Sequence, residues 1–435
     1  MATGKTLRAG RMSRFVLCLT AICLLTGCTM LSVRRFDNDF DGLNAAASRS
    51  NSAGGTLRIL FVHGMGHHQP GYSQPVMQGI AARLNLSDTG SSRRITIRKE
   101  SHDYGEINIA NYSSSEGKKV RAYELTWSAT TDALKARQFA SDATYASSRV
   151  LVNRQLKAQL IDDALADPVL YIGRYRNHMQ FPLMRAIVAI LHDYEPQDEL
   201  AIITQSLGSY MCYDTLLKMS RGERIMGEKE YSADVVQDLI GHTNYVYMLA
   251  NQLPLLELSE VSNPLPLRHA PATAVKALAE IRRQNKPRAR LQRPQAPLAL
   301  HLVAFSDPND LLSYPLDQSS ISGSTIVYSN VAVSVERSAI LGVFAWPMTA
   351  HTGHDKSKVV MDLLAFGHKG ADSRTESCAA RPLSRPNPGA APIPTAHTAR
   401  PRFAGNRCND NRPMPMADSS TRIVSHRKRI HQRTP

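Results

Sequence analysis

Ser206 stands in the sequence TQSLG, at the end of the apolar run ELAIITQ (199–205). A serine hydroxyl becomes a nucleophile when a base takes its proton, an acid orients that base and N–H donors stabilise the oxyanion that develops. The turn matches the G-x-S-x-G nucleophile elbow at Gly208 and departs from it at Thr204, where the motif has a small residue. An alternative stays open, because serine is also a favoured N-cap and a helix is expected from residue 207.

A second candidate segment is HGMGHH (63–68), which follows the apolar run LRILFV directly. Its two glycines allow backbone N–H groups to point into a cleft, as an oxyanion site requires. A metal site made by His63, His67 and His68 is the weaker interpretation, because no carboxylate lies at ligand spacing and the histidines do not share a helix face. We therefore expect no metal ion and no cofactor.

Two aspartates follow a later apolar run, in LALHLVAFSDPNDLLSYPL (298–316). Pro308 and Asn309 favour a turn with Asp310 at its exposed tip, so Asp310 is the preferred acid and Asp307 the reserve. In the purely structural interpretation, Asp307 forms an Asx turn and Asp310 caps a short helix.

Two histidines lie in FAWPMTAHTGHDKSKVV (344–360), in a loop before the last expected helix. Histidine can take up and return a proton near neutral pH, which is the role of the base. We expect His351 to be this base, with His354 in reserve.

Strand and helix patterns alternate along the segment that holds these residues. Strands are expected in LRILFVHG (57–64), ITIRKE (95–100), VRAYELTWS (120–128), ELAIITQ (199–205), NYVYMLANQ (244–252), the start of 298–316 and, as an edge strand, TIVYSNVAVSV (325–335). Helices are expected over 130–192, with a break at Asp167-Pro168, over 207–220 and over about 272–283. Continuous apolar strands that alternate with helices predict an α/β fold, with a mostly parallel sheet and helices on both faces.

Residues 57–368 resemble an α/β-hydrolase of the esterase/lipase type. The motifs that carry this resemblance are LFVHGMG, ITQSLGS, AFSDPND and TAHTGH, and the chain order Ser, Asp, His is the one this fold uses. The resemblance implies that Ser206 is the nucleophile, His351 the base and Asp310 the orienting acid. Gln205 departs from the family pattern, in which a histidine often precedes the serine.

The same resemblance implies that the backbone N–H groups of Met65 and Leu207 donate to the oxyanion. The substrate would be a small-molecule or lipid ester cleaved through an acyl-enzyme, although an amide or a thioester fits the same machinery. Long inserts over 130–195 and 251–297 would cover the carboxyl ends of the strands, where such sheets bind ligands. The alternative is a non-catalytic envelope lipoprotein that uses a hydrolase-like fold as a binding module.

The N-terminus has the pattern of a secretory signal, with basic residues ahead of the apolar run FVLCLTAICLL (15–25). This run is too short to span a bilayer. Its ending, LTGC, resembles the bacterial lipobox, which implies a signal peptide over 1–27 and a diacylated Cys28 as membrane anchor. The expected location is the cell envelope, and Thr29 after the cysteine favours the outer membrane.

Two segments flank the expected hydrolase-like body. Residues 28–56 are polar and predict a flexible tether behind the lipid. Residues 369–435 are rich in Pro and Arg and lack periodicity, which predicts a disordered basic tail.

The charge distribution argues against a nucleic-acid partner. The chain has a formal net charge of +15, but residues 1–35 carry six Lys or Arg and no acid, and residues 369–435 carry thirteen against four Asp or Glu. The segment between them is therefore neutral, and it offers no basic surface for phosphates.

The cysteines give no sign of a metal site, because no C-x-x-C spacing occurs. Cys18 and Cys23 would leave with the signal peptide. Cys212 is expected to be a small core residue, whereas Cys378 and Cys408 lie in the tail and would be free to pair.

Overall fold

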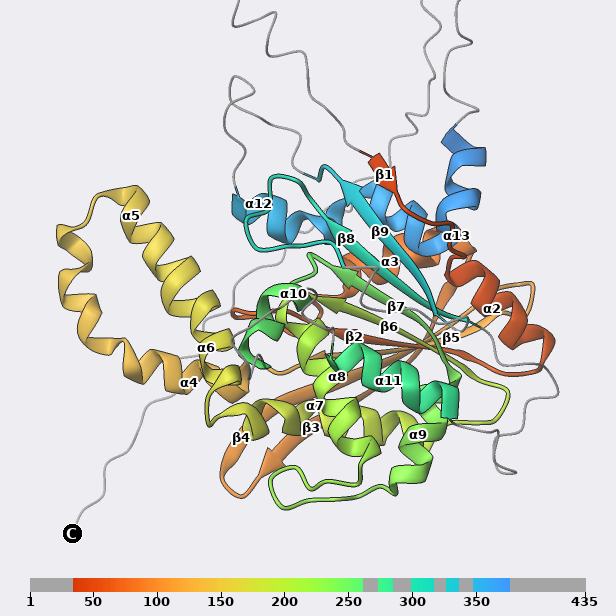
Figure 1. The fold of residues 1–435 in the computed structure, drawn as a ribbon, viewed down its shortest axis with the longest axis horizontal. Coiled ribbons are helices and arrows are strands. Elements are labelled where there is room, and N and C mark those ends of the chain that lie inside the picture. Colours follow the sequence, from red (N-terminus) through yellow and green to blue (C-terminus); the bar gives the residue numbers. More distant parts are fainter. Residues whose placement is uncertain (1–33, 261–272, 285–298, 317–325, 336–346, 376–435) are drawn as a thin grey trace, which may run out of the picture. The chain divides into compact units, whose positions relative to one another are not determined.

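The computed structural model describes residues 34–260, 273–284, 299–316, 326–335 and 347–375 of the chain. The strands are β1 (Arg34–Phe36), β2 (Leu57–Val62), β3 (Ser87–Lys99), β4 (His102–Ser113), β5 (Lys119–Thr126), β6 (Glu199–Gln205), β7 (Thr243–Leu249), β8 (Leu300–Ser306) and β9 (Ile326–Val333). They form one mixed, mostly parallel sheet in the order β1-β9-β8-β7-β6-β2-β5-β4-β3 (Figure 1). The predicted α/β fold class is confirmed.

The main helices are α2 (Leu43–Ser52), α3 (Gln74–Leu84), α4 (Ala129–Gln138), α5 (Leu151–Leu156), α6 (Ala166–Ile172), α7 (Arg176–His192), α8 (Leu207–Ser220), α9 (Ala233–His242), α10 (Leu253–Leu256), α11 (Thr273–Gln284), α12 (Pro347–Thr352) and α13 (Lys358–Thr375). Shorter or irregular turns are the 3₁₀ segments η1 (Ala140–Ser148), η3 (Glu257–Glu260) and η5 (Gly353–Lys356) and the π-helical segment η2 (Lys157–Leu165). Among the described residues, no helix is both long and apolar enough to cross a membrane.

Both faces of the sheet are buried, because alternate side chains of each central strand enter different cores. In β2, Ile59 and Phe61 pack in the core beneath α2, α3 and α13, whereas Leu60 and Val62 pack in the core beneath α7, α8 and α9 (Figure 1). This arrangement explains the continuous apolar runs of the central strands, since a parallel strand covered on both sides has no polar face.

Strand β2 pairs in parallel with β5 on one side and with β6 on the other. The chain leaves β2 towards α3 on one face of the sheet and leaves β6 towards α8 on the opposite face. Adjacent strands whose connections diverge in this way open a crevice at their carboxyl ends, which is where open α/β sheets bind ligands. We call this edge of the sheet the carboxyl edge.

The flexible tether predicted for 28–56 is wrong for most of its length. Strand β1 pairs antiparallel with β9, and α2 buries Leu43, Ala46 and Ala47 against the sheet. The sequence of α2 combines alanines with polar residues, which is also typical of a linker. The small alanine side chains let the helix pack closely on the sheet. The described body therefore begins at residue 34, while Cys28 and the signal peptide lie outside the described residues.

Four other features differ from expectation. The break expected at Asp167-Pro168 is absent, because η2 continues directly into α6, which contains Pro168. The chain turns instead at residues 173–175. The expected edge strand β9 is covered by β1, and β4 was not predicted. Helix α13 extends to Thr375, into the expected tail, and the rest of the tail lies outside the described residues.

Candidate active site

Ser206 occupies a sharp turn between β6 and α8. Its backbone has φ 52° and ψ −125°, a conformation that side-chain-bearing residues rarely adopt. The N–H of Ser206 donates to the carbonyl oxygen of Leu249 at the end of β7 (2.9 Å), which fixes the turn to the sheet. Ser206 occupies the N-cap position of α8, but its side chain makes no capping hydrogen bond, so its hydroxyl does not cap the helix. This backbone has the strained strand-to-helix geometry of a nucleophile elbow.

Two glycines make room for this turn. A Cβ at Gly208 would lie 2.5 Å from the carbonyl oxygen of His63, and a Cβ at Gly64 would lie 2.7 Å from the Cβ of Ser206. Both distances are shorter than any carbon–oxygen or carbon–carbon contact allows, so the loop after β2 and the elbow after β6 can approach only without these side chains.

Thr204, the departure from the elbow motif, is accommodated through its hydroxyl group. It is buried, and its Oγ1 donates to the carbonyl oxygen of Tyr247 (3.2 Å) while the Oγ of Ser209 lies 2.8 Å away. Because Oγ1 has only one proton, Ser209 is the donor in the second bond. The hydroxyl group of Thr204 thus makes satisfied hydrogen bonds between strand and helix.

The structure brings Ser206, His351 and Asp310 into direct contact. The Oγ of Ser206 lies 3.0 Å from Nε2 of His351, and Nδ1 of His351 lies 2.8 Å from Oδ2 of Asp310. All three side chains are buried. A carboxylate accepts hydrogen bonds only, so the proton on the imidazole sits on Nδ1 and Nε2 can accept the serine proton. The three residues named from the sequence therefore have the geometry of a nucleophile–base–acid relay.

Asp310 is held in its charged form. Burial alone would raise its pKa, but the hydrogen bond and charge of His351, together with the N–H of Leu312, outweigh burial and hold the pKa below the ordinary value. The reserve candidate Asp307 makes the predicted Asx turn, because its Oδ1 accepts from the N–H of Asn309 (2.8 Å), and its Oδ2 accepts from the N–H of Val335. It lies beside the relay without joining it.

The reserve base His354 also lies behind the relay. Its Nδ1 is 3.4 Å from the carbonyl oxygen of His351, and its Nε2 has no hydrogen-bond partner among the described residues. Burial lowers the pKa of His354 to about 4, so the ring is neutral at physiological pH. The structure thus separates the two histidines that the sequence left in competition.

His63 is a structural support for the HGMGHH loop. Its ring stacks between Trp127 and His68, its Nδ1 contacts the carbonyl oxygen of Gly64 (2.8 Å) and its Nε2 accepts from the N–H of Trp127 (3.0 Å). Burial, followed by the neighbouring His68, lowers the pKa of His63 well below its ordinary value. Both ring nitrogens are occupied, which is incompatible with metal binding at His63, and no group of three or more possible ligands occurs in the described part of the chain.

The two expected oxyanion donors are available. Within the described residues, the N–H groups of Met65 and Leu207 donate to no protein acceptor. Leu207 is the first residue of α8, where the backbone N–H has no helical partner and the helix dipole favours negative charge. Donation of these groups to a substrate oxygen stays a prediction.

An ionic clamp that the sequence did not reveal holds the HGMGHH loop against the segment from α4 to α6. The N–H of Gly66 donates to Oδ2 of Asp167 (2.7 Å), and the N–H of His67 donates to Oδ2 of Asp163 (3.0 Å). Lys135 of α4 is buried between these carboxylates, with Nζ 2.9 Å from Oδ1 of Asp163 and 3.2 Å from Oδ1 of Asp167. The charges of these partners outweigh burial and raise the pKa of Lys135, so it remains a cation.

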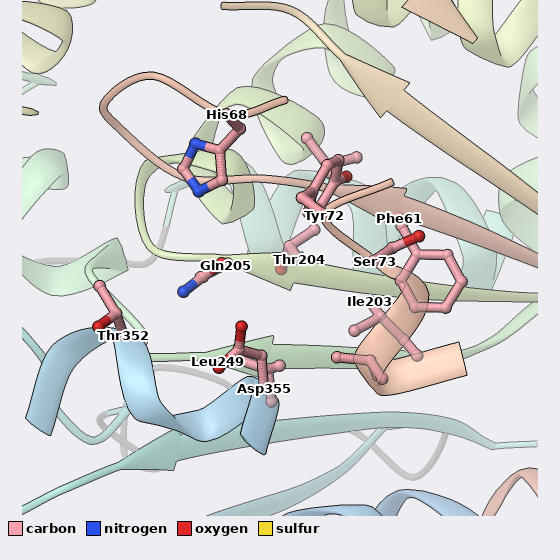
Figure 2. A pocket seen from close by; sticks show the side chains of 12 residues that line it. Phe61, His68, Tyr72, Ser73, Ile203, Thr204, Gln205, Leu249, Thr352 and Asp355 are labelled. Carbon is pink, nitrogen blue, oxygen red and sulfur yellow. The ribbon is translucent and has the colours of Figure 1, made fainter. Parts of the chain in front are cut away.

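A small cavity lies between the end of β6, the start of α3 and the turn after α12 (Figure 2). Its volume is about 90 Å³. Its lining includes the apolar side chains of Phe61, Tyr72, Val76, Ile203 and Leu249 and the polar side chains of His68, Gln205, Thr352 and Asp355. Ser206, His351 and Asp310 are not among its lining residues, although Gln205 and Thr352 are the chain neighbours of the first two.

Of the cysteines, Cys212 is described and is buried in α8, as expected for a core residue. Burial raises the pKa of its thiol to about 12, so it is unreactive at neutral pH. Cys28, Cys378 and Cys408 lie outside the described residues.

Comparison of the chain with protein-family models, with curated proteins and with solved structures finds no match.

Proposed function

We propose that the chain is a serine hydrolase of the α/β-hydrolase type that cleaves carboxylic esters. The observation that carries the proposal is the continuous chain of contacts from Ser206 Oγ to His351 and from His351 to Asp310, set on a strained turn at the carboxyl edge. A serine that only packs or caps needs neither a buried imidazole partner nor a positive φ.

In the proposed reaction, Ser206 Oγ attacks the ester carbonyl carbon while its proton passes to Nε2 of His351. The N–H groups of Met65 and Leu207 stabilise the oxyanion. The tetrahedral adduct collapses as the carbon–oxygen bond to the alcohol breaks, and His351 returns the proton to that oxygen. Water then attacks the acyl-serine with His351 as base, which releases the carboxylic acid and restores the hydroxyl of Ser206. Asp310 keeps the imidazole oriented and stabilises its charged form.

A fluorophosphonate probe tests the proposal directly, because it phosphonylates only an activated serine. The purified protein should be labelled at Ser206, and Ser206→Ala and His351→Ala should remove the label. Ser232→Ala is the matched control, since Ser232 caps α9 away from the relay. A folded protein that takes no label would reject the hydrolase and favour the binding-module alternative.

We also propose that Cys28 is diacylated and anchors the protein to the cell envelope, at the outer membrane. The LTGC motif supports this anchor. When cells that express the protein are given radiolabelled palmitate, the label should appear on the protein, and Cys28→Ser should abolish this labelling. A label that persists on the variant would place the lipid elsewhere.

A further inference from the structure

The exposed apolar side chains of the protein are concentrated at one edge of the sheet. In the described part of the chain, the large apolar residues that remain well exposed fall in three segments, 145–172, 255–258 and 311–314. Among them Val150, Leu151 and Leu311 are exposed by 67%, 58% and 70%. Such grouped exposure is costly in water and marks surfaces that contact a protein or a membrane.

These segments all follow carboxyl ends of parallel strands. The segment 145–172 lies between β5 and α7, the segment 255–258 follows β7, and the segment 311–314 follows β8 directly after Asp310. Figure 1 shows α5, α10 and α12, which carries His351, at the same side of the sheet. We name these three segments the apolar rim, and they surround the edge at which Ser206 lies.

Strand β1 fixes where the lipid anchor enters the body. It runs antiparallel to β9, with Arg34 opposite Val333, the last residue of β9. Because β9 is parallel to β8, Arg34 enters the sheet at the carboxyl edge. Only six residue steps separate Cys28 from Arg34, a reach of at most about 20 Å when the chain is fully extended. An acylated Cys28 would therefore hold the β1 end of the carboxyl edge within about 20 Å of the bilayer.

We propose that the apolar rim docks on the lipid bilayer, so that the mouth of the Ser206 site faces the membrane. The occupant is a lipid surface because the anchor and the rim lie at the same edge, and because the consecutive exposed residues Val150, Leu151 and Val152 begin α5, which continues directly into η2 as one helical segment. An apolar helix tip of this kind gains stability when it enters the acyl boundary of a membrane. The site would then receive substrate from the bilayer. The docking proposal rests on the acylation of Cys28 for its orientation and does not require hydrolysis.

The test uses the mature chain without its lipid, residues 28–435 with Cys28→Ser, and vesicles of phosphatidylethanolamine and phosphatidylglycerol. The protein should float with the vesicles. The double variant Val150→Asp/Val152→Asp should bind at least tenfold more weakly. The matched control is Ser52→Asp/Ala53→Asp, which adds the same charge at exposed positions just before β2, at the opposite edge. It should bind as the parent does.

Two results would overturn the proposal: equal vesicle binding by both double variants, or a parent that stays in solution and instead self-associates through the rim, as measured by light scattering. Hydrolysis of a water-soluble ester without vesicles should be equal in all three proteins. Absence of hydrolysis together with rim-dependent flotation would reject the hydrolase and leave the docking surface standing.

Discussion

Replacement of His354 by leucine should make the stability of the protein less sensitive to acid while sparing the reaction of Ser206 with a fluorophosphonate. His354 is fully buried three residues after His351, and it touches neither Ser206 nor Asp310 through its ring nitrogens. Leucine is close to histidine in volume and carries no titratable group, so the variant removes the proton site and keeps the packing.

The magnitude follows from the folded and unfolded pKa values of this imidazole. Burial lowers its pKa from 6.5 to about 4. As the pH falls below 6.5, the unfolded chain takes up a proton that the folded protein refuses until about pH 4, so stability decreases through this window. Because proton binding is linked to unfolding, this pKa difference lowers the free energy of unfolding by about 2 kcal/mol between about pH 7.5 and pH 5. The total decrease at lower pH is about 3 kcal/mol.

Urea denaturation of the parent and of His354→Leu at these two pH values measures the effect. Between about pH 7.5 and pH 5, the free energy of unfolding of the parent should decrease by about 2 kcal/mol more than that of the variant. Because the comparison is a difference of differences, the acid sensitivity due to buried His63 cancels. Equal losses in the two proteins would refute the assignment of His354 as a buried neutral ring. A folded variant that no longer takes the probe would refute the choice of His351 as base.

Three further substitutions test how the site is held. Gly64→Ala should slow acylation about a hundredfold, since the added Cβ displaces Ser206, and burst kinetics with an ester should show it; an unchanged rate would mean that the loop yields freely. Lys135→Met should lower the free energy of unfolding by about 3 kcal/mol in urea denaturation, because it leaves the charges of Asp163 and Asp167 uncompensated. It should also lower kcat more than it raises KM. Lys135→Arg should restore the stability and the kinetic constants. Thr204→Gly should destabilise the protein by about 2 kcal/mol without faster acylation; faster acylation would show that Thr204 limits the reaction.

Local patterns predicted the parts of the fold that local forces decide. The apolar run ELAIITQ ends where β6 ends, and the 3.6-residue period from Leu207 gives α8 with its observed bounds, because burial on both faces and helical periodicity are encoded in consecutive residues. The order of Ser206, Asp310 and His351 allowed the relay to be named before its distances were known. Their catalytic roles stay a prediction until a probe reports on them.

What the sequence did not reveal depends on contacts between distant segments. Lys135, Asp163 and Asp167 look like ordinary charges of amphipathic helices, and their clamp on the HGMGHH loop exists only because α4, η2 and α6 fold back over that loop. The segment after Cys28 was misjudged for a related reason. Alanine-rich α2 is stabilised by close packing on the sheet rather than by large apolar side chains, so its composition resembles that of a linker.

The mismatch at Thr204 has the same kind of explanation. The elbow motif asks for a small residue at this position because strand and helix approach closely after the serine. Here the residue that faces Thr204 from α8 is Ser209, and its hydroxyl meets Oγ1 of Thr204 at 2.8 Å, so the crowding becomes a hydrogen bond. At this contact the small residue is Ser209 on the helix, and the larger residue is Thr204 on the strand. Because Ser206 retains its positive φ and its contact with His351, the altered motif preserves the geometry on which nucleophilic attack depends.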